Sequence, residues 1–304
     1  MNGVIVVDKP AGFTSFDVVA VMRGICHERK IGHTGTLDPM ATGVLPLLLG
    51  SATRALPFLE DTSKEYRAGF RFGTATDTQD ITGHVTAQSS VKVTRGQIQD
   101  ALPQFRGDIM QTPPMYSAIS VNGRRLYDLA RQGIEVERKK RPVTIFRMEL
   151  VEFDEALQEG YLEVACSKGT YIRTICANLG EALGTCGVMT SLRRACASGF
   201  SLEDAITIGQ AKELAAQGRI SECLKPTESL FAGMPKVSVS QAQAVRFSNG
   251  GALDVGRTPL RACLLQQDVR FRVFAPDGAF LGLGTVSGDE LRVLRLFRLR
   301  EERQ

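Results

Sequence analysis

The 304-residue sequence predicts an α+β fold in two domains. Segments typical of strands are mixed with segments typical of helices, without a regular βαβ repeat. No G-x-G-x-x-G motif follows the first apolar run, which disfavours a doubly wound nucleotide-binding fold. The chain is also longer than one hydrophobic core usually fills, so two domains are expected.

The N-terminal part predicts a buried strand, a helix, a loop and a half-buried strand, in that order. Residues 4–7 are an apolar run that ends in a turn. Thr14 and Asp17 form a capping box in front of an apolar stripe with helical spacing. Glycines and a proline break every period over residues 30–43, which indicates a shaped loop. Apolar and polar side chains alternate over residues 64–73, as in a strand with one buried face.

The middle of the chain predicts three more helices and two strands. Thr94 is placed to cap a helix that runs to Leu102, and the two prolines at 113 and 114 force an extended turn before the next helix. Apolar periodicity predicts the remaining elements, which are a helix at 126–132, strands at 143–151 and 161–166, and a helix that begins after Gly169-Thr170.

A domain boundary is expected near residue 233, because residues 222–235 are interrupted by prolines and a glycine. The first domain would span residues 1–233 and the second residues 234–304. Short segments rich in β-formers and separated by glycine turns predict a compact β-barrel-like second domain. Its expected strands lie at 237–239, 270–274, 279–283 and 292–296.

The positive charge of the chain is concentrated in the expected second domain. The formal net charge is +4, and from Lys236 onward eleven Lys and Arg stand against seven Asp and Glu. The first 235 residues are therefore balanced. A basic module suits contact with phosphates, although a solvated basic surface without a partner explains the same count.

Composition argues against membrane, secreted and metal-dependent classes. With 43% apolar residues, the chain has no run near the roughly 18 apolar residues of a membrane span and no signal peptide, so cytoplasmic residence is expected. The seven cysteines include no C-x-x-C pair, and the three histidines are dispersed. Neither a disulfide framework nor a metal site is expected, and any catalysis should need no metal.

The most informative segment is the loop around Asp38, which reads IGHTGTLDPMATG over residues 31–43. Its glycines allow the backbone to come close to a ligand. Pro39 biases Asp38 towards an extended conformation, which would fix the direction of the carboxylate. Asp38 is therefore a candidate for chemistry, although Asp-Pro pairs often only turn the chain.

Several separated motifs, in matching order and spacing, resemble the TruB family of tRNA pseudouridine-55 synthases. They cover residues 3 to about 200 and comprise Asp8-Lys9-Pro10-Ala11-Gly12 with Thr14-Ser15, the glycine-rich loop at 32–43, Lys64-Glu65-Tyr66, Gly73 with Thr76-Asp77-Thr78 and Asp80, Gln111-Thr112-Pro113-Pro114-Met115-Tyr116-Ser117-Ala118, Ala130-Arg131-Gln132-Gly133 and Gly169-Thr170-Tyr171-Ile172-Arg173.

The resemblance implies the pseudouridine synthase fold, which is a mixed, mostly antiparallel central sheet flanked by helices. It also implies a small C-terminal β-barrel-like PUA domain. The implied activity is isomerisation of uridine 55 in the T loop of tRNA, with no cofactor. The implied partner is tRNA, bound at its T stem-loop and, through the C-terminal domain, at its acceptor end. A monomer with no membrane association is expected.

The resemblance assigns the reaction to three residues. Asp38 is the catalytic carboxylate, and whether it attacks the base or the sugar or assists glycal formation stays open. Arg173 would pair with Asp38 and keep it charged and aimed, although its position also fits a surface arginine on a first helical turn. Tyr66 would stack on the target base and could take the C5 proton, while its pattern alone fits a core tyrosine.

Other residues are implied to bind the RNA or to support the site, namely His33, Tyr171, Leu192, Lys9, Pro10 and Gly35. A stacked uridine must swing out before a pocket can reach it, and His33 matches the family histidine that fills the vacated place. Tyr171 and Leu192 match pocket walls but also fit the core. Lys9 and Pro10 match an element that supports the active site.

Two positions depart from the family pattern. The family commonly has a lysine within two positions after Ala118, where this chain has Ile119 and Ser120. Gln79 stands where the family commonly has an acid. Two other interpretations stay open at this point. The chain could be a tRNA-binding or folding module without isomerase activity. It could also be a metal-free glycosidase, for which Asp77 or Asp80 would supply the second acid.

Overall fold

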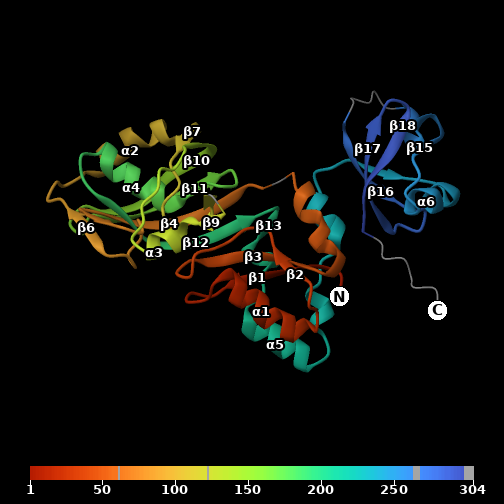
Figure 1. Cartoon of the computed structure of the whole chain (residues 1–304), viewed down its shortest axis with the longest axis horizontal. Coiled ribbons are helices and arrows are strands. Elements are labelled where there is room, and N and C mark those ends of the chain that lie inside the picture. The colour runs from red at the N-terminus through yellow and green to blue at the C-terminus, as the bar shows by residue number, and fades with distance from the viewer. Residues whose placement is uncertain (61, 122, 263–267, 298–304) are drawn as a thin grey trace.

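The computed structural model describes residues 1–60, 62–121, 123–262 and 268–297 of the chain (Figure 1). Within these residues the strands form a nine-stranded sheet, a five-stranded sheet and two short hairpins. The five-stranded sheet lies at the C-terminal end of the chain, set apart from α2 and α4 at the opposite end of the molecule (Figure 1). No helix in the described part combines the length and the apolar character that crossing a membrane needs.

The nine-stranded sheet has the order β1-β3-β12-β4-β11-β10-β7, with β2 and β13 paired at its side. Its strands are β1 Gly3–Lys9, β2 Ile31–His33, β3 Thr42–Leu49, β4 Lys64–Phe72, β7 Gly107–Gln111, β10 Arg141–Asp154, β11 Glu159–Cys166, β12 Gly187–Ala197 and β13 Phe200–Ser201. Among the described strands of this sheet only β12 and β3 pair in parallel, over Arg193↔Thr42 and Arg194↔Gly43. The predicted mixed, mostly antiparallel central sheet is confirmed.

Helices cover this sheet in two groups (Figure 1). The α-helices are α1 Ser15–Cys26, α2 Arg95–Ala101, α3 Leu126–Arg131, α4 Ile172–Ala182, α5 Ile208–Ala216 and α6 Gln241–Ser248, and 3₁₀ turns occupy Gly50–Phe58, Leu102–Phe105, Leu202–Asp204, Ile220–Cys223, Thr227–Phe231, Val255–Arg257 and Pro259–Ala262. Helices α1 and α5 share one apolar core with β1 and β3. Helices α2 and α4 share another with β4, β11 and β12.

The hairpins pair β5 Thr74–Thr76 with β6 Val85–Gln88 and β8 Ser120–Val121 with β9 Arg124–Arg125.

Strand β1 is buried on both faces. Ile5 and Val7 pack into the core beneath α1 and α5. Val4 and Val6 point the other way, into a core that also includes Leu283 and Phe297 of the C-terminal part. A strand covered on both sides reads as a continuous apolar run, which confirms the buried strand predicted from residues 4–7.

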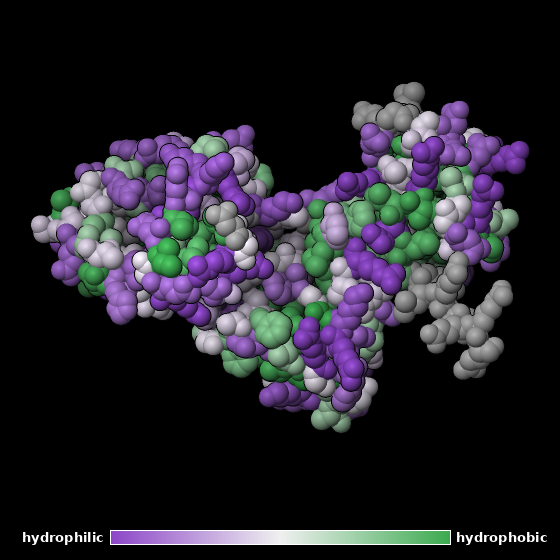
Figure 2. All heavy atoms as spheres, viewed as in Figure 1, coloured by the Kyte–Doolittle hydropathy of each residue, from purple (hydrophilic) through white to green (hydrophobic). Residues whose placement is uncertain are grey.

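The C-terminal sheet is built only from residues after 235. It has the order β14-β16-β17-β18-β15, with β14 Lys236–Ser238, β15 Leu253–Asp254, β16 Arg270–Phe274, β17 Phe280–Ser287 and β18 Glu290–Leu296. Phe247 of α6 is buried with Val273 and Leu281 in a core of its own. Figure 2 shows apolar residues gathered where this sheet meets the rest of the chain, where the rings of Phe280 and Phe297 stack with centroids 5.6 Å apart. The division at residues 233 and 234 stays a prediction.

One sequence prediction needs correction, and the strands that were not predicted include two long ones. Residues 30–43 were expected to be loop throughout, but their ends form β2 and the start of β3, because Ile31 and His33 pair with Leu49 and Leu47. A three-residue strand is too short to show periodicity. Strands β3 and β12, which lie next to each other inside the sheet, were not expected from their patterns.

Candidate active site

A cavity of about 650 Å³ opens where the two halves of the large sheet meet. Its lining comes from the loop at 36–40, from β4 and β12, from the turn at 78–82, from the segment 116–118 with α3, and from residues 169–173 at the start of α4. Five of the residues singled out from the sequence line it, namely Asp38, Tyr66, Tyr171, Arg173 and Leu192. These residues are far apart in the chain, and the fold brings them together.

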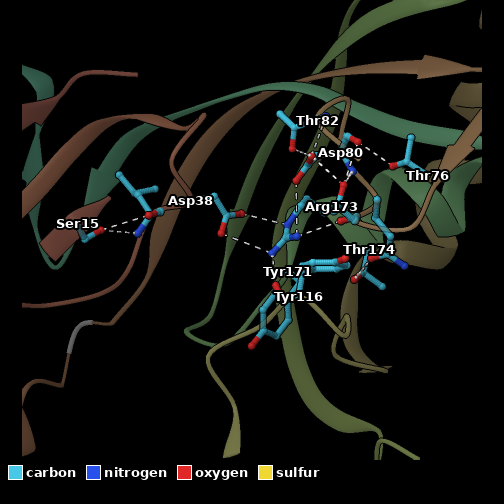
Figure 3. A network of polar contacts seen from close by, with 12 residues as sticks. Ser15, Asp38, Thr76, Asp80, Thr82, Tyr116, Tyr171, Arg173 and Thr174 are labelled. Carbon is cyan, nitrogen blue, oxygen red and sulfur yellow. Dashed lines mark hydrogen bonds and ion pairs between the residues drawn. The ribbon is translucent and has the colours of Figure 1, made fainter. Parts of the chain in front are cut away.

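The Asp38 loop is anchored on both sides of the carboxylate. On one side, the buried Ser15 hydroxyl accepts the Leu37 N–H at 2.8 Å and donates to the Leu37 carbonyl at 3.3 Å. On the other side, the Pro39 carbonyl accepts the Gly12 N–H at 2.9 Å and the Lys9 ammonium at 3.2 Å. Both neighbours of the acid are thereby fixed to the start of the chain. Asp38 lines the cavity, and its carboxylate points toward Arg173 (Figure 3).

Arg173 meets Asp38 from the first turn of α4. Its Nε lies 3.0 Å from Asp38 Oδ2 and its Nη2 lies 3.5 Å from Oδ1, while only 5% of the arginine is exposed. The other donors of the guanidinium are held by the carbonyls of Thr78 at 3.0 Å and Tyr116 at 2.8 Å. A planar group held at this many points has one orientation, so Arg173 aims the carboxylate as well as balancing its charge (Figure 3).

Asp80 holds the opposite side of Arg173, at 3.6 Å between Oδ2 and Nη1. Its other oxygen, Oδ1, accepts from the hydroxyls of Thr78 at 2.9 Å and Thr82 at 2.5 Å and from the Thr82 N–H at 3.0 Å. Both carboxylate oxygens of this buried acid are thus engaged, so Asp80 is a support for Arg173. From the sequence it was considered only as the second acid of a glycosidase. The spacing Thr-x-Asp-x-Thr over residues 78–82 is the signal that could have indicated a hydrogen-bonded acid.

Gln79 occupies a specialised position in the same turn. Its backbone is left-handed, with φ of 62°, and its side-chain oxygen accepts from the Thr174 hydroxyl at 2.8 Å. The amide therefore ties the turn that carries Asp80 to the helix that carries Arg173. An acid at this position, which the family pattern favours, could accept the same bond.

Tyr66 and Leu192 form a wall of the cavity from adjacent strands. Tyr66 on β4 is 6% exposed and lies opposite Arg194 of β12, while Leu192 lies opposite Ala68. Tyr171 completes the site at the start of α4, where its backbone N–H donates to Gln111 Oε1 at 2.8 Å and its carbonyl accepts from Gln111 Nε2 at 3.0 Å. The cavity thus has a wall of apolar and aromatic side chains beside Asp38.

The remaining predicted residues lie next to the cavity rather than in its described lining. Lys9 is fully buried, and its ammonium donates to the carbonyls of Pro10 at 2.9 Å, Phe13 at 2.5 Å and Pro39. Gly35 lies against the side chain of Lys64. His33 is half-buried on β2, and its Nδ1 is buried without a hydrogen-bond partner. Lys9 therefore supports the loop, whereas an RNA contact by His33 or Gly35 stays a prediction.

The comparisons with known proteins agree with the motifs. The model of the TruB family pseudouridylate synthase N-terminal domain matches residues 23–172, and that of the tRNA pseudouridylate synthase B C-terminal domain matches residues 173–232. The chain belongs to the TruB family. The tRNA pseudouridine synthase B of Alkaliphilus oremlandii is 45% identical over 253 residues, which cover 83% of each protein. That of Syntrophomonas wolfei is 38% identical over 99% of this chain and 100% of its own.

Solved structures extend the likeness to the whole fold of this TruB chain. The Cbf5 chain of a Cbf5-Nop10-Gar1 complex superposes with a TM-score of 0.75 at 26% identity and covers 98% of this chain and 85% of its own. A box H/ACA Nop10-Cbf5 complex matches with a TM-score of 0.73 at 23% identity, over 99% of this chain and 87% of its own. The predicted pseudouridine synthase fold is confirmed.

The electrostatics of the TruB site are set by burial. Burial raises the pKa of Asp38, Arg173 opposes that rise, and the nearby Asp80 adds to it. Burial also raises the pKa of Tyr66 to about 12, against a hydrogen bond from Arg194 that lowers it. At neutral pH the Tyr66 hydroxyl is therefore protonated. Within the described ranges no three His, Cys, Asp or Glu side chains are grouped so that they could hold a metal ion.

Replacing Ser15 with alanine is expected to slow catalysis by about tenfold to a hundredfold, because loop misplacement near 1 Å has effects of that size. The variant leaves two buried backbone groups of Leu37 without their partner, so stability should fall by about 1–3 kcal/mol. Turnover and thermal melting would be measured together. Thr14→Ala removes the exposed cap bond to the Asp17 N–H and costs about 1 kcal/mol, yet should leave turnover unchanged. Equal turnover losses in both variants would contradict the anchoring role of Ser15.

Proposed function

We propose that this TruB chain isomerises uridine 55 in the T loop of tRNA to pseudouridine. The observation that carries the proposal is the Asp38 carboxylate, held by the buried Arg173 and facing a cavity walled by Tyr66 and Leu192. The TruB family acts on RNA, and relatives that align over most of their length are named tRNA pseudouridine synthase B. An oriented acid beside an aromatic wall is what a reaction on a pyrimidine nucleotide needs.

The reaction breaks the bond between C1′ and N1 of the uridine and forms a bond between C1′ and C5. A proton leaves C5 and N1 gains one, so nothing is oxidised or reduced and no cofactor is required. Asp38 acts in its ionised form, either as a nucleophile on the sugar or base or by assisting glycal formation. The Arg173 guanidinium favours that ionised form against the burial that opposes it.

Tyr66 would stack on the everted base, because its ring forms the cavity wall beside Leu192. Its hydroxyl is protonated at neutral pH and accepts a hydrogen bond from the guanidinium of Arg194. It can take the C5 proton only as its own proton moves on. The bond from Arg194 supports such a step, since it stabilises the phenolate that would form.

The finer features of the substrate belong to this proposal. The uridine leaves the stack of the T loop, and His33 would fill the vacated place, with its present half-buried position changing on binding. The T stem-loop would lie over the cavity, and the arginines of the C-terminal sheet would contact the acceptor end. Action as a monomer in the cytoplasm is part of the same proposal.

The test is a T stem-loop hairpin with uridine at position 55, incubated with the protein and analysed for pseudouridine. We expect conversion at position 55 and none in a hairpin that carries cytidine there. Binding without conversion would favour the tRNA-binding module, and release of free uracil would favour the glycosidase. Either result contradicts the proposed isomerisation.

A further inference from the structure

Lys64 is a cation of the cavity that has no counter-charge among the residues that the structure describes. It begins β4, and its side chain lies on the same face as that of Tyr66, two residues later. It lines the cavity, yet no described residue offers it a hydrogen bond or a carboxylate within ion-pair distance. The two acids of the cavity, Asp38 and Asp80, are both engaged with Arg173. Lys64 is therefore available to a ligand.

The surroundings of Lys64 repel other cations and would attract an anion. Burial and the neighbouring charge of Arg194 lower the pKa of Lys64 to about 8, while Cys166 opposes this shift and Lys168 adds to it. His33 lies within the electrostatic reach of Arg194 and of Lys64. An ammonium that is largely buried without a partner is unfavourable, and pairing it with an anion removes that cost. At neutral pH Lys64 is therefore still protonated in most molecules.

The backbone at Gly35 makes room for this ammonium. A Cβ built at Gly35 would lie 2.9 Å from Lys64 Nζ and 3.2 Å from its Cε. The absence of a side chain at this point of the Asp38 loop thus lets the ammonium lie against the loop. Lys64 Nζ stands beside the segment that carries the catalytic acid, close to where an everted nucleotide would enter.

We propose that Lys64 binds a phosphodiester that flanks the target uridine, beside the part of the cavity that receives the base. The inference rests on the proposed function, because the uridine itself is neutral and the flanking phosphodiesters are the anions that enter with it. Two parts of the cavity would then have different functions. Asp38 and Arg173 act on the nucleoside, and Lys64 fixes the backbone to which it is attached.

The test is a double-mutant cycle between Lys64→Gln and hairpins with one neutral methylphosphonate, placed either 5′ or 3′ of the target uridine. Binding is measured in the Asp38→Asn background, so that no turnover intervenes. We expect Lys64→Gln to weaken binding of the all-phosphate hairpin by about tenfold to a hundredfold. One of the two methylphosphonates should weaken binding by a similar factor, and the combination should lose no more than either change alone. The salt slope of log Kd should fall by roughly 0.7–0.9.

Lys168→Gln is the matched control, because Lys168 is an exposed neighbour of Lys64 that does not line the cavity. Its effect should add to that of either methylphosphonate. Gly35→Ala is a second variant, in which the new methyl group displaces the flexible Lys64 ammonium while the charge is kept. It should reduce the discrimination against the same methylphosphonate.

The inference would be overturned if the loss of affinity from Lys64→Gln added to that of the methylphosphonate at both linkages. It would also be overturned if Lys64→Gln bound the all-phosphate hairpin as tightly as the protein that keeps Lys64. These outcomes concern binding alone and do not depend on turnover. Failure of the proposed isomerisation would be seen separately, because the unchanged protein, with Asp38 in place, would form no pseudouridine.

Discussion

Replacing Asp38 with asparagine is expected to abolish isomerisation, with a loss on the order of 10⁴-fold or more in kcat. Asparagine has nearly the same shape but cannot form an ionised oxygen, so it can neither attack the nucleotide nor stabilise a developing positive charge on the sugar. The anchors of the loop at Leu37 and Pro39 use backbone groups, which the substitution leaves in place. Pseudouridine formed in a single turnover is the measurement.

Binding provides the control for this variant. The affinity of the T stem-loop for Asp38→Asn should stay within a few fold of the original, since the phosphate contacts are untouched. The melting temperature should also be close to the original, because the Asp38 side chain is 35% exposed and the buried Arg173 keeps Asp80 and the carbonyls of Thr78 and Tyr116 as partners. Activity within tenfold of the original protein would show that another group carries the reaction.

Replacing Arg173 with methionine is expected to lower kcat by about a thousandfold, the size found when a fixed charge is removed from a reacting site. The substitution also strands the buried Asp80 carboxylate and the carbonyls of Thr78 and Tyr116, which should cost about 3–5 kcal/mol of stability. Adding Asp80→Asn removes the stranded charge. The double variant should regain much of the stability and none of the activity, which separates the two roles of Arg173.

The pH profile gives a further measure of the same pair. Asp38 acts when ionised, so kcat/KM falls as the pH decreases through its pKa. Burial raises that pKa, and Arg173 opposes the rise. The acid limb should therefore lie above the ordinary aspartate value of about 3.9 and should move to higher pH in Arg173→Met. A limb that moves to lower pH, or does not move, would contradict the electrostatic role assigned to Arg173.

Much of the fold could be predicted from local patterns. The capping boxes at Thr14 and Thr94 mark the starts of α1 and α2, and the alternation over residues 64–73 marks β4. The central strand β12 could not be predicted, because it carries Arg193 and Arg194 where a buried strand should be apolar. Arg194 is tolerated there since its guanidinium donates to the carbonyls of Gly35, Thr36 and Val44, all distant in the sequence.

Strand β3 escaped prediction for a related reason. Pro46 stands in the middle of it, and a proline argues against a central strand. Here its carbonyl accepts the Thr34 N–H at 3.2 Å, and the missing donor is tolerated. In the site, the pairing of Asp38 with Arg173 came from family resemblance, since 135 residues separate them and no local pattern connects them. The supports at Ser15 and Asp80 depend on that tertiary contact and were not expected.

The parallel contact between β12 and β3 has a consequence for the working enzyme. Only the pairs Arg193↔Thr42 and Arg194↔Gly43 join the two strands, and a methyl group at Gly43 would lie 2.2 Å from the Arg194 carbonyl. Asp38 lies on the β3 side of this short junction, while Tyr66 and Arg173 lie on the β12 side. Small shifts at the junction would therefore change the distance between the Asp38 carboxylate and the nucleotide. Substitutions elsewhere that loosen the junction should slow turnover and leave the affinity for RNA unchanged.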